Sequence, residues 1–406
     1  MKNISGNPYL TKKGEKVFID STPLDEIVRN YETPLLIFME NRIRANISTF
    51  LSIFKEQFEN FSCFYSFKAN FLPEICKIIS NEGIGAEVVS LPELRLALKT
   101  GFLPNNVIVG APYLPNDLIE YSIKNNVDEM IIYNIGDLRK INTIAEKYDQ
   151  IQKICIRVNS GKFDSKLGIK FDKDKIELLV QSLKSYKNIK ISSILSHFGT
   201  QMNDVNQFRN NVKSLILNLK LLSNHSVIIE NINLGGGFPE ASVMPHKQLK
   251  KIAQMMKNEL IESNIIFKKI ICEPGRYFVG DSGLYLTKIV NLNDNRWIFL
   301  DIGNHICPKF ARCSLRFYNA SQINEPHKYK TCIAGIVPTD QDVLAKNYFF
   351  TENPKVEDNV LVTNVGAYCV TFSNRFPYLL PGIIIIDGDK VIQIFDPVDD
   401  HDFSIK

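Results

Sequence analysis

The sequence predicts an α/β protein that combines an N-terminal (β/α)8 barrel of the TIM type with a C-terminal antiparallel β-domain. Two observations lead to this prediction. Between about residues 34 and 274, short β-branched or aromatic segments alternate with amphipathic helical segments, as in parallel sheets with right-handed crossovers. After about residue 280 the helical segments stop, and closely spaced strands follow between Asn, Asp, Gly and Pro turns.

The alternating region is expected to form the barrel. Strand and helix pairs are expected at 34–38 and 40–54, 63–67 and 72–81, 106–109 and 115–125, 129–133 and 136–147, and 153–158 and 173–185. Further strands are expected at 189–195, 229–234 and 270–272. The number of strands approaches eight, which favours a closed barrel over an open sheet. Barrels carry their chemistry at the carboxyl ends of the strands, so the residues there are candidates for a site.

The C-terminal region is expected to form a separate β-domain. Its strands are expected at 283–290, 296–300, 331–336, 359–363 and 382–387. The first 30 residues should join it, because 16–20 is a lone strand outside the alternating pattern. The predicted domains are therefore 1–30 with the β-domain, 31–275 as the barrel and 276–406 as the β-domain.

Composition excludes several classes of protein. A chain of 406 residues is too long for one ordinary core, and 45% hydrophobic with 23% charged residues is typical of a globular protein. The net charge of +4 and the lack of a basic stripe argue against nucleic acid as a partner. No segment reaches the roughly 18 apolar residues of a membrane helix, so we expect a cytoplasmic protein without membrane contact. The eight cysteines lie far apart without a CxxC pair, which predicts reduced core residues and no metal site.

The most informative motif is Tyr65-Ser-Phe-Lys68-Ala-Asn70, where a lysine ends an apolar strand. An isolated buried ammonium is costly, so this lysine must be paired, deprotonated or used covalently. The plainer alternative is a lysine that snorkels to solvent. Further motifs follow in order: Glu87 in 85–90, Arg157 in 156–159, the 165–169 turn, His197 and Thr200 in 196–201, 233–238, 273–276, 301–303 and 366–368.

In their order and spacing these motifs resemble those of the fold-type III pyridoxal-phosphate enzymes, which include diaminopimelate, ornithine and arginine decarboxylases. The resemblance extends from about residue 30 to about residue 380. It implies an alanine racemase-like fold, pyridoxal 5'-phosphate as cofactor, and removal of the α-carboxylate of an amino acid or an amino-acid conjugate.

The resemblance also implies roles for individual residues. Lys68 would form the Schiff base, and Lys68, His197, Glu273 and Tyr368 would be the catalytic residues. The implied cofactor contacts are Lys68, Glu87, Arg157, His197, Thr200, Gly235, Gly236, Gly237, Glu273, Gly275, Arg276 and Tyr368. Consecutive glycines let backbone N–H groups approach a phosphate, although a plain flexible turn is the alternative. His197 would stack on the cofactor ring, and the alternative is a core histidine.

Glu273 favours decarboxylation over racemisation. A carboxylate on the pyridine nitrogen keeps that nitrogen protonated, so the ring is a full electron sink. Related alanine racemases have an arginine there. A surface salt bridge would be the alternative for Glu273 if Pro-Gly-Arg276 did not follow it.

Two departures from the family pattern leave alternatives open. Decarboxylases of this fold carry a reprotonating cysteine where this chain has Pro338, so Lys68, Tyr368, Cys369 and His305 become candidate proton donors. The residues after Asp301 lack the Arg and Tyr with which diaminopimelate decarboxylases recognise the distal centre, which makes that substrate doubtful. An epimerase or racemase, or a non-catalytic regulatory relative, is therefore a possible alternative.

The segment from 304 to 319 is more similar to decarboxylases of specialised metabolism, which act on siderophore intermediates or carrier-bound amino acids. Its arginines suit a carrier-bound or citrate-conjugated substrate, although solvated surface arginines are the alternative. The candidate substrate contacts are His305, Arg312, Arg316, Thr339, Asp340 and Asp342. The resemblance also implies a homodimer with a shared site.

Overall fold

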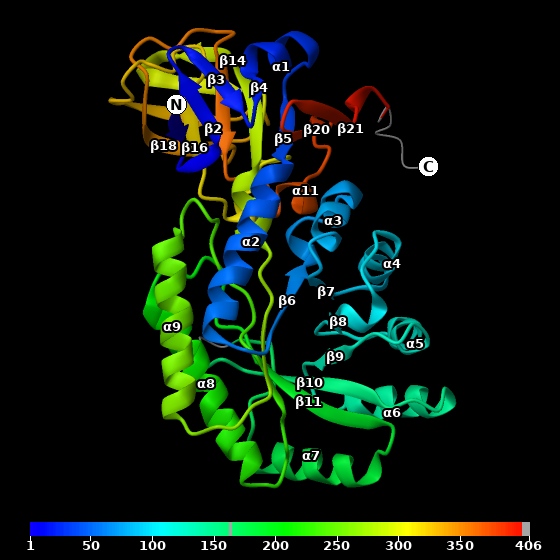
Figure 1. Cartoon of the computed structure of the whole chain (residues 1–406). Helices are drawn as coiled ribbons and strands as arrows, with labels where there is room; N and C mark the ends of the chain where they lie inside the picture. Colours follow the sequence, from blue (N-terminus) through cyan, green and yellow to red (C-terminus); the bar gives the residue numbers. More distant parts are fainter. Residues whose placement is uncertain (162–164, 400–406) are drawn as a thin grey trace. The chain divides into compact units, whose positions relative to one another are not determined.

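The computed structural model describes residues 1–161 and 165–399, and the structural statements below refer to these residues. The chain forms two compact units (Figure 1). The β unit comprises Met1–Asn46, Glu240–Val243 and Arg276–Lys406, and the barrel unit comprises Ile47–Pro239 and Met244–Gly275.

The barrel unit contains a closed barrel of eight strands in the order β10-β11-β12-β13-β6-β7-β8-β9. All neighbouring strands are parallel. The strands are β6 (Phe61–Ser66), β7 (Gly85–Val88), β8 (Val107–Gly110), β9 (Glu129–Ile132), β10 (Gln152–Val158), β11 (Ile189–Ser196), β12 (Asn231–Asn233) and β13 (Lys269–Cys272). The predicted parallel barrel is therefore confirmed.

One predicted barrel strand was wrong. The segment β5 (Leu35–Met39) pairs with β14 (Gly283–Asn293) and β20 (Gly382–Asp387) in the β unit. The eighth barrel strand is instead β7, which carries the motif residue Glu87. A fully apolar run of five residues fits a central strand of any buried sheet, so its pattern could not distinguish between the two sheets. Residues 31–46 accordingly belong to the β unit.

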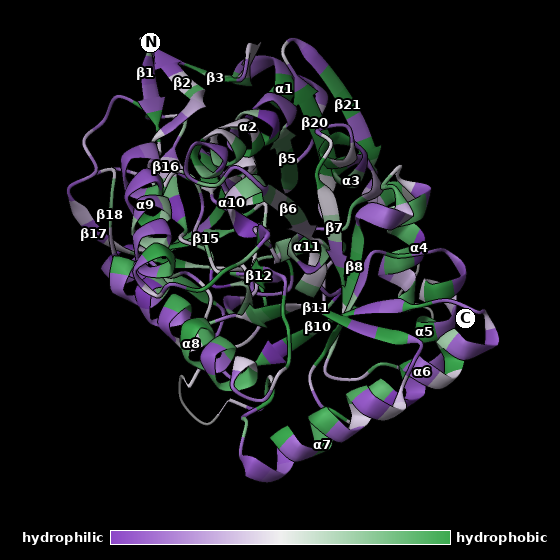
Figure 2. Ribbon diagram, turned by 60° about the horizontal axis from the view of Figure 1, so that its bottom comes forward, coloured by the Kyte–Doolittle hydropathy of each residue, from purple (hydrophilic) through white to green (hydrophobic). Residues whose placement is uncertain are grey.

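Amphipathic helices connect the barrel strands. They are α3 (Pro73–Ser80), α4 (Leu91–Lys99), α5 (Asn116–Lys124), α6 (Asp137–Lys147), α7 (Lys173–Ser185), α8 (Val205–Ser223) and α9 (His246–Glu262), with short turns η1 (Phe67–Ala69) and η2 (Pro104–Asn106). Helix α2 (Glu40–Gln57) contributes residues to both units. Along α7, hydrophobic and hydrophilic residues alternate, as expected for a helix with one buried side (Figure 2). Helix α8 begins with a capping box between Asp204 and Gln207, which satisfies its first backbone N–H groups.

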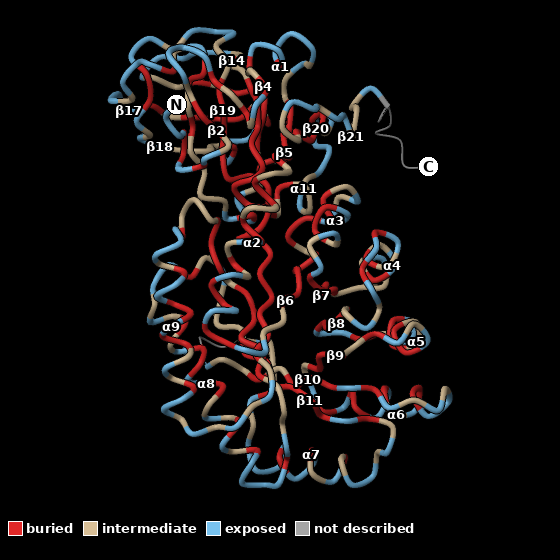
Figure 3. Tube along the Cα trace, viewed as in Figure 1, coloured by how far each residue is buried: buried red, intermediate tan, exposed pale blue. Residues whose placement is uncertain are grey.

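Side chains from six strands fill the barrel interior. They are Phe64, Ile108, Ile131, Cys155, Leu195 and Ile271. Strands β6 to β9 are largely buried, whereas the helices outside them expose residues to solvent (Figure 3). The barrel is therefore a packed core, and the candidate site residues lie at the strand ends.

The β unit contains two sheets and short helices. A four-stranded antiparallel sheet consists of β1 (Lys2–Ile4), β2 (Asn7–Lys13), β3 (Lys16–Ile19) and β4 (Thr22–Pro23). The nine-stranded sheet consists of β5, β14, β15 (Trp297–Leu300), β16 (Arg316–Asn319), β17 (Tyr329–Ala334), β18 (Val343–Phe350), β19 (Asn359–Thr363), β20 and β21 (Lys390–Phe395). The helices are α1 (Leu24–Asn30), α10 (Arg276–Val279) and α11 (Cys369–Phe372), and the short turns are η3 (Gly280–Ser282), η4 (Asp294–Arg296), η5 (Lys309–Ala311) and η6 (Pro397–Asp399).

The larger sheet is mixed rather than purely antiparallel. Strand β15 runs parallel to β17, and β5 runs parallel to β20, while the other pairings described are antiparallel. One hydrophobic core joins both sheets and α1, and includes Ile19, Ile27, Ile37, Leu286 and Ile384. Among the helices described, none combines the length and apolar character needed to cross a bilayer.

Candidate cofactor and active site

The predicted site residues fall in both units. The barrel unit contains Lys68, Glu87, Arg157, His197, Thr200, Gly235, Gly236, Gly237, Glu273 and Gly275, and the β unit contains Arg276, Tyr368 and all six candidate substrate residues. Within the barrel, these residues lie at or just beyond the carboxyl ends of β6, β7, β10, β11, β12 and β13. Because the strands are parallel, their carboxyl ends meet at one rim of the barrel.

Lys68 forms an ion pair with Glu87. Its Nζ lies 2.6 Å from Glu87 Oε2, and Ser66 Oγ donates a hydrogen bond of 2.5 Å to the same oxygen. The Glu87 side chain is 3% exposed, whereas that of Lys68 is 44% exposed. Asn70 anchors the turn after β6, since its side chain accepts from the backbone N–H of Leu72 and its carbonyl accepts from Tyr65. The lysine is therefore held by a buried carboxylate while its amine stays accessible.

Glu273 is a buried carboxylate at the end of β13. Asn233 Nδ2 donates a hydrogen bond of 2.7 Å to Glu273 Oε1, while Oε2 has no hydrogen-bond donor among the described residues. Burial first, and the Glu87 charge second, raise the pKa of the Glu273 carboxyl to about 7. A cationic N–H group placed at Oε2 would therefore stabilise the ionised carboxylate, adding to the partial compensation from Lys68 and Arg157.

The glycine triplet is required by close backbone packing. A Cβ at Gly236 would lie 2.3 Å from the carbonyl oxygen of Glu273, and a Cβ at Gly237, whose φ is +92°, would lie 2.2 Å from that of Gly199. Either contact is too short for any larger residue. The N–H of Gly237 has no acceptor among the described residues. An unpaired N–H at a glycine turn is a typical donor for a phosphate oxygen.

His197 and Arg157 flank these groups. The N–H of Gly236 donates to His197 Nδ1 at 3.3 Å, which leaves the proton of the neutral ring on Nε2. Arg157 donates to Tyr133 Oη at 2.7 Å, and its guanidinium lies 4.7 Å from the centre of the Tyr133 ring. The Gly236 contact fixes the orientation of the His197 ring, and the Tyr133 contact fixes that of the Arg157 guanidinium.

The remaining predicted barrel residues are Thr200 and Gly275. Thr200 is exposed after β11. Gly275 lies against the Ala69 and Ser66 side chains, where a Cβ would come within 2.8 Å of that of Ala69. The glycine therefore lets the chain after Glu273 pass close to the Lys68 turn.

Three site residues were missed by the sequence reasoning: Ser66, Tyr133 and Asn233. Ser66 and Asn233 stand inside quoted motifs, so their position beside Lys68 and Gly235 was an available signal. Asn233 also accepts from the N–H of Gly235 through Oδ1, at 2.9 Å. It thus connects the glycine turn to Glu273. Tyr133 carried no signal, because it reads as the last apolar residue of a strand.

In the β unit, Arg276 is the centre of a second polar cluster. Its guanidinium forms a buried ion pair with Glu240 at 3.2 Å and donates to the carbonyl of Ala311 at 2.6 Å. It also lies 4.8 Å from the centre of the Tyr368 ring. Tyr368 has φ of +68°, an uncommon value for a non-glycine residue. The structure therefore brings these two predicted residues together within one unit.

The six candidate substrate residues have different environments. Asp342 is buried, and its carboxylate accepts from the backbone N–H groups of Asn304 at 2.7 Å and Val337 at 2.8 Å. Arg316 donates to the carbonyl of Ser5 at 2.9 Å. These two side chains hold the fold together, whereas Arg312 is exposed.

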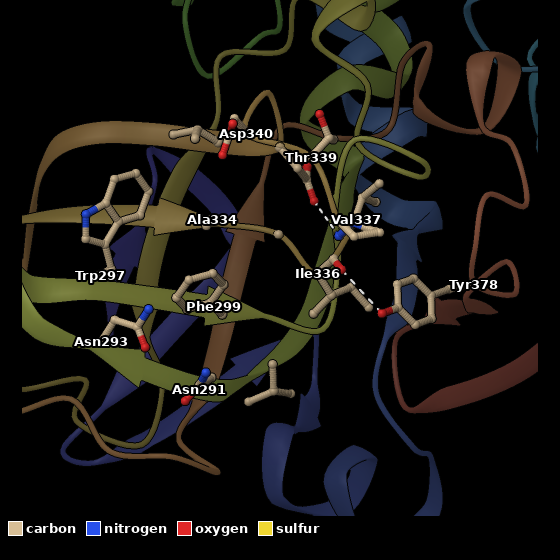
Figure 4. A pocket seen from close by; sticks show the side chains of 15 residues that line it. Asn291, Asn293, Trp297, Phe299, Ala334, Ile336, Val337, Thr339, Asp340 and Tyr378 are labelled. Carbon is tan, nitrogen blue, oxygen red and sulfur yellow. Dashed lines mark hydrogen bonds between the residues drawn. The ribbon is translucent and has the colours of Figure 1, made fainter.

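Thr339 and Asp340 are exposed and lie at an open pocket of about 830 Å³, together with Pro338, Trp297 and Tyr378 (Figure 4). His305 lines a second cavity of about 530 Å³. Both of its ring nitrogens are buried without a hydrogen-bond partner in the described chain. Burial lowers the pKa of His305 to about 4, so this ring is neutral near pH 7.

Comparison with known proteins identifies the family and the fold. Residues 44–280 match the family model of the pyridoxal-dependent decarboxylase, pyridoxal binding domain. The chain is 27% identical to the diaminopimelate decarboxylase of Aquifex aeolicus, over 98% of this chain and 97% of that protein. It is 25% identical to the L-glutamyl-(BtrI acyl-carrier protein) decarboxylase of Niallia circulans, over 87% of this chain and 88% of that protein. The crystal structure of diaminopimelate decarboxylase from M. jannaschii superimposes with a TM-score of 0.87 at 21% identity, covering 97% of this chain and 96% of that chain.

A parallel barrel with a lysine, a glycine turn and a buried carboxylate at one rim offers the groups that a pyridoxal-phosphate enzyme needs. The family model covers more than half of the chain, so the chain belongs to the pyridoxal-dependent decarboxylase family. It is a pyridoxal-phosphate-dependent amino-acid decarboxylase, as the resemblance implied.

The barrel rim fits this cofactor. The accessible amine of Lys68 suits its aldehyde, the unpaired Oε2 of Glu273 suits a protonated pyridine nitrogen, and the unpaired N–H of Gly237 suits its phosphate. Among the described residues, no group of three or more His, Cys, Asp or Glu side chains could hold a metal ion.

Proposed function

We propose that this decarboxylase anchors its cofactor through Lys68 and removes the α-carboxylate of an amino acid that carries a second polar or charged group, either free or attached to a carrier. The observation that supports this most directly is the position of Lys68, Gly237 and Glu273 at the carboxyl ends of barrel strands. Bound pyridoxal phosphate supplies a ring that withdraws electrons from Cα when CO2 leaves.

Lys68 and Glu87 act together in this proposal. To attach the cofactor, the lysine must lose a proton, and Glu87 Oε2 at 2.6 Å is placed to hold the charged amine whenever the lysine is not bonded to the cofactor. Ser66 holds Glu87 in position through the same oxygen. The pair thereby keeps the amine directed at the rim.

Glu273 would hold a proton on the pyridine nitrogen. Its ionised form is disfavoured by burial, and a cationic partner at Oε2 would lower its raised pKa toward the ordinary range. Asn233 would orient the carboxylate through Oε1. This charge arrangement favours decarboxylation over racemisation, because it strengthens the withdrawal of electrons from Cα.

The remaining predicted contacts keep their proposed roles. His197 would cover the ring face, Arg157 would orient the ring hydroxyl, and Thr200 with the glycine turn would bind the phosphate. The roles of Gly275, Arg276 and Tyr368 at the cofactor come from the family resemblance.

Among the four candidate proton donors we favour Lys68. His305 is neutral near pH 7 because burial lowers its pKa to about 4. Hydrogen bonds to Cys307 and Cys313, and then burial, raise the pKa of Cys369 well above its ordinary value, and its side chain is fully buried. Tyr368 stays as the alternative donor.

The names of the relatives support the proposed substrate class. Several are named diaminopimelate decarboxylases, and one is named for a glutamyl group on an acyl-carrier protein. Both kinds of substrate carry a polar group beyond Cα. The exposed residues Thr339 and Asp340, at the pocket of Figure 4, are our candidates for contact with that group. We also propose that the protein is cytoplasmic and forms a homodimer. Sedimentation velocity can test the homodimer.

The test is CO2 release by the cofactor-loaded protein from L- and D-ornithine, lysine, arginine, meso-diaminopimelate, and citrate-conjugated or carrier-bound amino acids. We expect CO2 release from one class of amino acid that carries a second polar group. This release should depend on Lys68. Exchange of the Cα hydrogen for deuterium without CO2 would contradict the proposal and identify an epimerase. Lack of cofactor binding would identify a regulatory relative.

A further inference from the structure

Three cysteines of the β unit lie together at the start of α11. Cys313 Sγ lies 3.6 Å from Cys369 Sγ and 3.4 Å from the carbonyl oxygen of Ala367. Cys307 is close enough to Cys369 to contribute to the raised pKa of the Cys369 thiol. Two sulfur atoms of one unit are therefore already in van der Waals contact, although the sequence places them far apart.

Cys313 also lies beside a cation. Arg276 Nη1 is 3.9 Å from Cys313 Sγ, and the same guanidinium lies over the Tyr368 ring. Cys313 is half-buried, whereas Cys369 and Cys307 are buried. Cys313 is therefore the more exposed residue of the contacting pair, and we expect a small oxidant to react with it before Cys369.

The pKa values of the two thiols are shifted in opposite directions. The hydrogen bond from Cys369 and the positive charge of Arg276 lower the pKa of the Cys313 thiol, against the effect of its burial. The pKa of Cys369 is raised, so its thiol stays protonated. Either sulfur can be the donor in the 3.6 Å contact, and Cys369 is placed to donate once Cys313 is ionised. This is the arrangement of an attacking thiolate next to a resolving thiol.

The cysteines of the barrel provide a contrast. Cys63 and Cys272 are opposite each other on β6 and β13. Both are buried, and burial raises their pKa values well above the ordinary value. Buried thiols of this kind are inert. Cys313 and Cys369 therefore differ from the barrel pair in their environment and not only in being close together.

We propose that Cys313 and Cys369 are a reversible oxidation site that closes to an intramolecular disulfide on exposure to hydrogen peroxide. The Cys313 thiolate attacks one peroxide oxygen, the O–O bond breaks, and the departing hydroxide takes up a proton, which leaves a sulfenic acid. Cys369 sulfur then attacks the sulfenic sulfur, the S–O bond breaks, and the thiol proton leaves with the hydroxyl as water. One peroxide is reduced to two waters, and two thiols lose two electrons.

Closing the disulfide must move the cluster. The two sulfur atoms have to approach by about 1.5 Å to reach bonding distance. Cys369 follows Tyr368 directly, and Cys313 would lose its contact with Arg276. Oxidation should therefore change the environment of two residues that the resemblance places at the cofactor, but the proposal itself does not depend on the decarboxylase activity.

The test is peptide mapping of the full protein after treatment with peroxide and alkylation of remaining thiols. Trypsin separates the three cysteines, because cleavage after Arg296, Lys309, Arg312, Arg316, Lys355 and Arg375 yields the peptides 297–309, 313–316 and 356–375. We expect one cross-linked species of 313–316 with 356–375, lighter by two hydrogens than the sum of both peptides and released by dithiothreitol. A cross-link from 297–309 instead would overturn the assignment.

Two variants and one control sharpen the test. Cys369→Ser should stop at the sulfenic acid of Cys313, which dimedone traps, and Cys313→Ser should form no cross-link. Cys332→Ser changes another half-buried cysteine of the same unit and should behave like wild type. Sulfinic acid at Cys313 in the wild-type protein without any cross-link would refute the proposal, as would equal peroxide sensitivity of Cys313 and Cys332.

Discussion

The Nζ of Lys68 lies 2.6 Å from Oε2 of the buried Glu87, and this contact follows from the register of two strands. Strands β6 and β7 are parallel, with Ser66 opposite Glu87. Lys68 stands two residues beyond Ser66 in the turn after β6, so its side chain returns to the carboxylate while its amine stays half-exposed. The barrel thereby places a charged amine at a rim where an isolated one would be costly.

Replacing Lys68 tests its role as covalent anchor. Lys68→Ala should abolish the visible absorbance of bound pyridoxal phosphate and reduce CO2 release by at least about a thousand-fold. Lys68→Arg keeps a cation beside Glu87 but has no reactive amine, so it should fold with wild-type stability and show the same loss.

A matched control for Lys68→Ala is Lys140→Ala. Lys140 pairs with the buried Asp137 at 3.1 Å, and the exposure of both side chains is close to that of the Lys68 pair. Its loss should leave absorbance and turnover unchanged. Comparable turnover by Lys68→Ala and the control would show that the anchor is elsewhere.

Glu273→Gln tests the buried carboxylate through its pH dependence. The folded-state pKa of about 7 is above the ordinary 4.5, so between these values the folded protein holds a proton that the unfolded chain releases. Stability is thus lost as the pH rises through this window, by on the order of 3 kcal/mol at most above pH 7. The cofactor-free Gln variant should unfold at higher urea than wild type at pH 8, and the difference should shrink toward pH 5.

The control for this variant is Glu56→Gln, which changes an exposed carboxylate of the same unit. Its urea midpoint should follow wild type at both values of pH. An advantage of Glu273→Gln that grows toward acid pH would contradict the raised pKa. With cofactor present the same variant should bind pyridoxal phosphate more weakly, because a neutral amide cannot balance a protonated ring nitrogen.

Asp281→Asn tests a buried ion pair that supports the β unit. Asp281 lies 2.7 Å from Arg42 and also accepts from Asn46 Nδ2 at 2.8 Å. Removing its charge leaves the buried guanidinium uncompensated, which typically costs about 3–5 kcal/mol. Glu357→Gln, which breaks the exposed pair with Lys288, should cost at most about 1 kcal/mol in the same urea titration. Equal losses would mean that the Asp281 site is hydrated.

Much of the barrel site could be predicted from the sequence, because its residues are local to strand ends. Lys68, the glycine turn and Glu273 each follow a short apolar strand, and Glu87 lies near the end of β7; parallel strands bring their ends to one rim. The contacts of Asn233 and Tyr133 could not be identified in this way, although the position of Asn233 beside Gly235 was an available signal. Their roles depend on which side chains meet across the barrel, and this information is not contained in any single strand.

The candidate substrate residues were harder to predict, because loops of the β unit carry them. An acidic residue next to Pro338 fits either a substrate contact or a structural role, and the sequence does not distinguish the two. In the structure Asp342 is 2% exposed, which favours a structural role for its carboxylate, whereas Asp340 is exposed. The prediction for β5 was wrong for a similar reason, because its apolar run fits either sheet.

Asp342→Ala tests the structural role of that carboxylate. Its two oxygens accept from the N–H groups of Asn304 and Val337, and thereby hold the turn after β15 against the loop that carries Pro338. Alanine would leave two backbone donors without an acceptor, and each buried unsatisfied donor costs roughly 1–3 kcal/mol. We expect a matching fall in the free energy of unfolding, measured with urea. Asp340→Ala should have an effect within about 0.5 kcal/mol, because its side chain is exposed. If Asp342→Ala instead keeps wild-type stability and raises only the KM, Asp342 binds the substrate and the sequence-based prediction for it was correct.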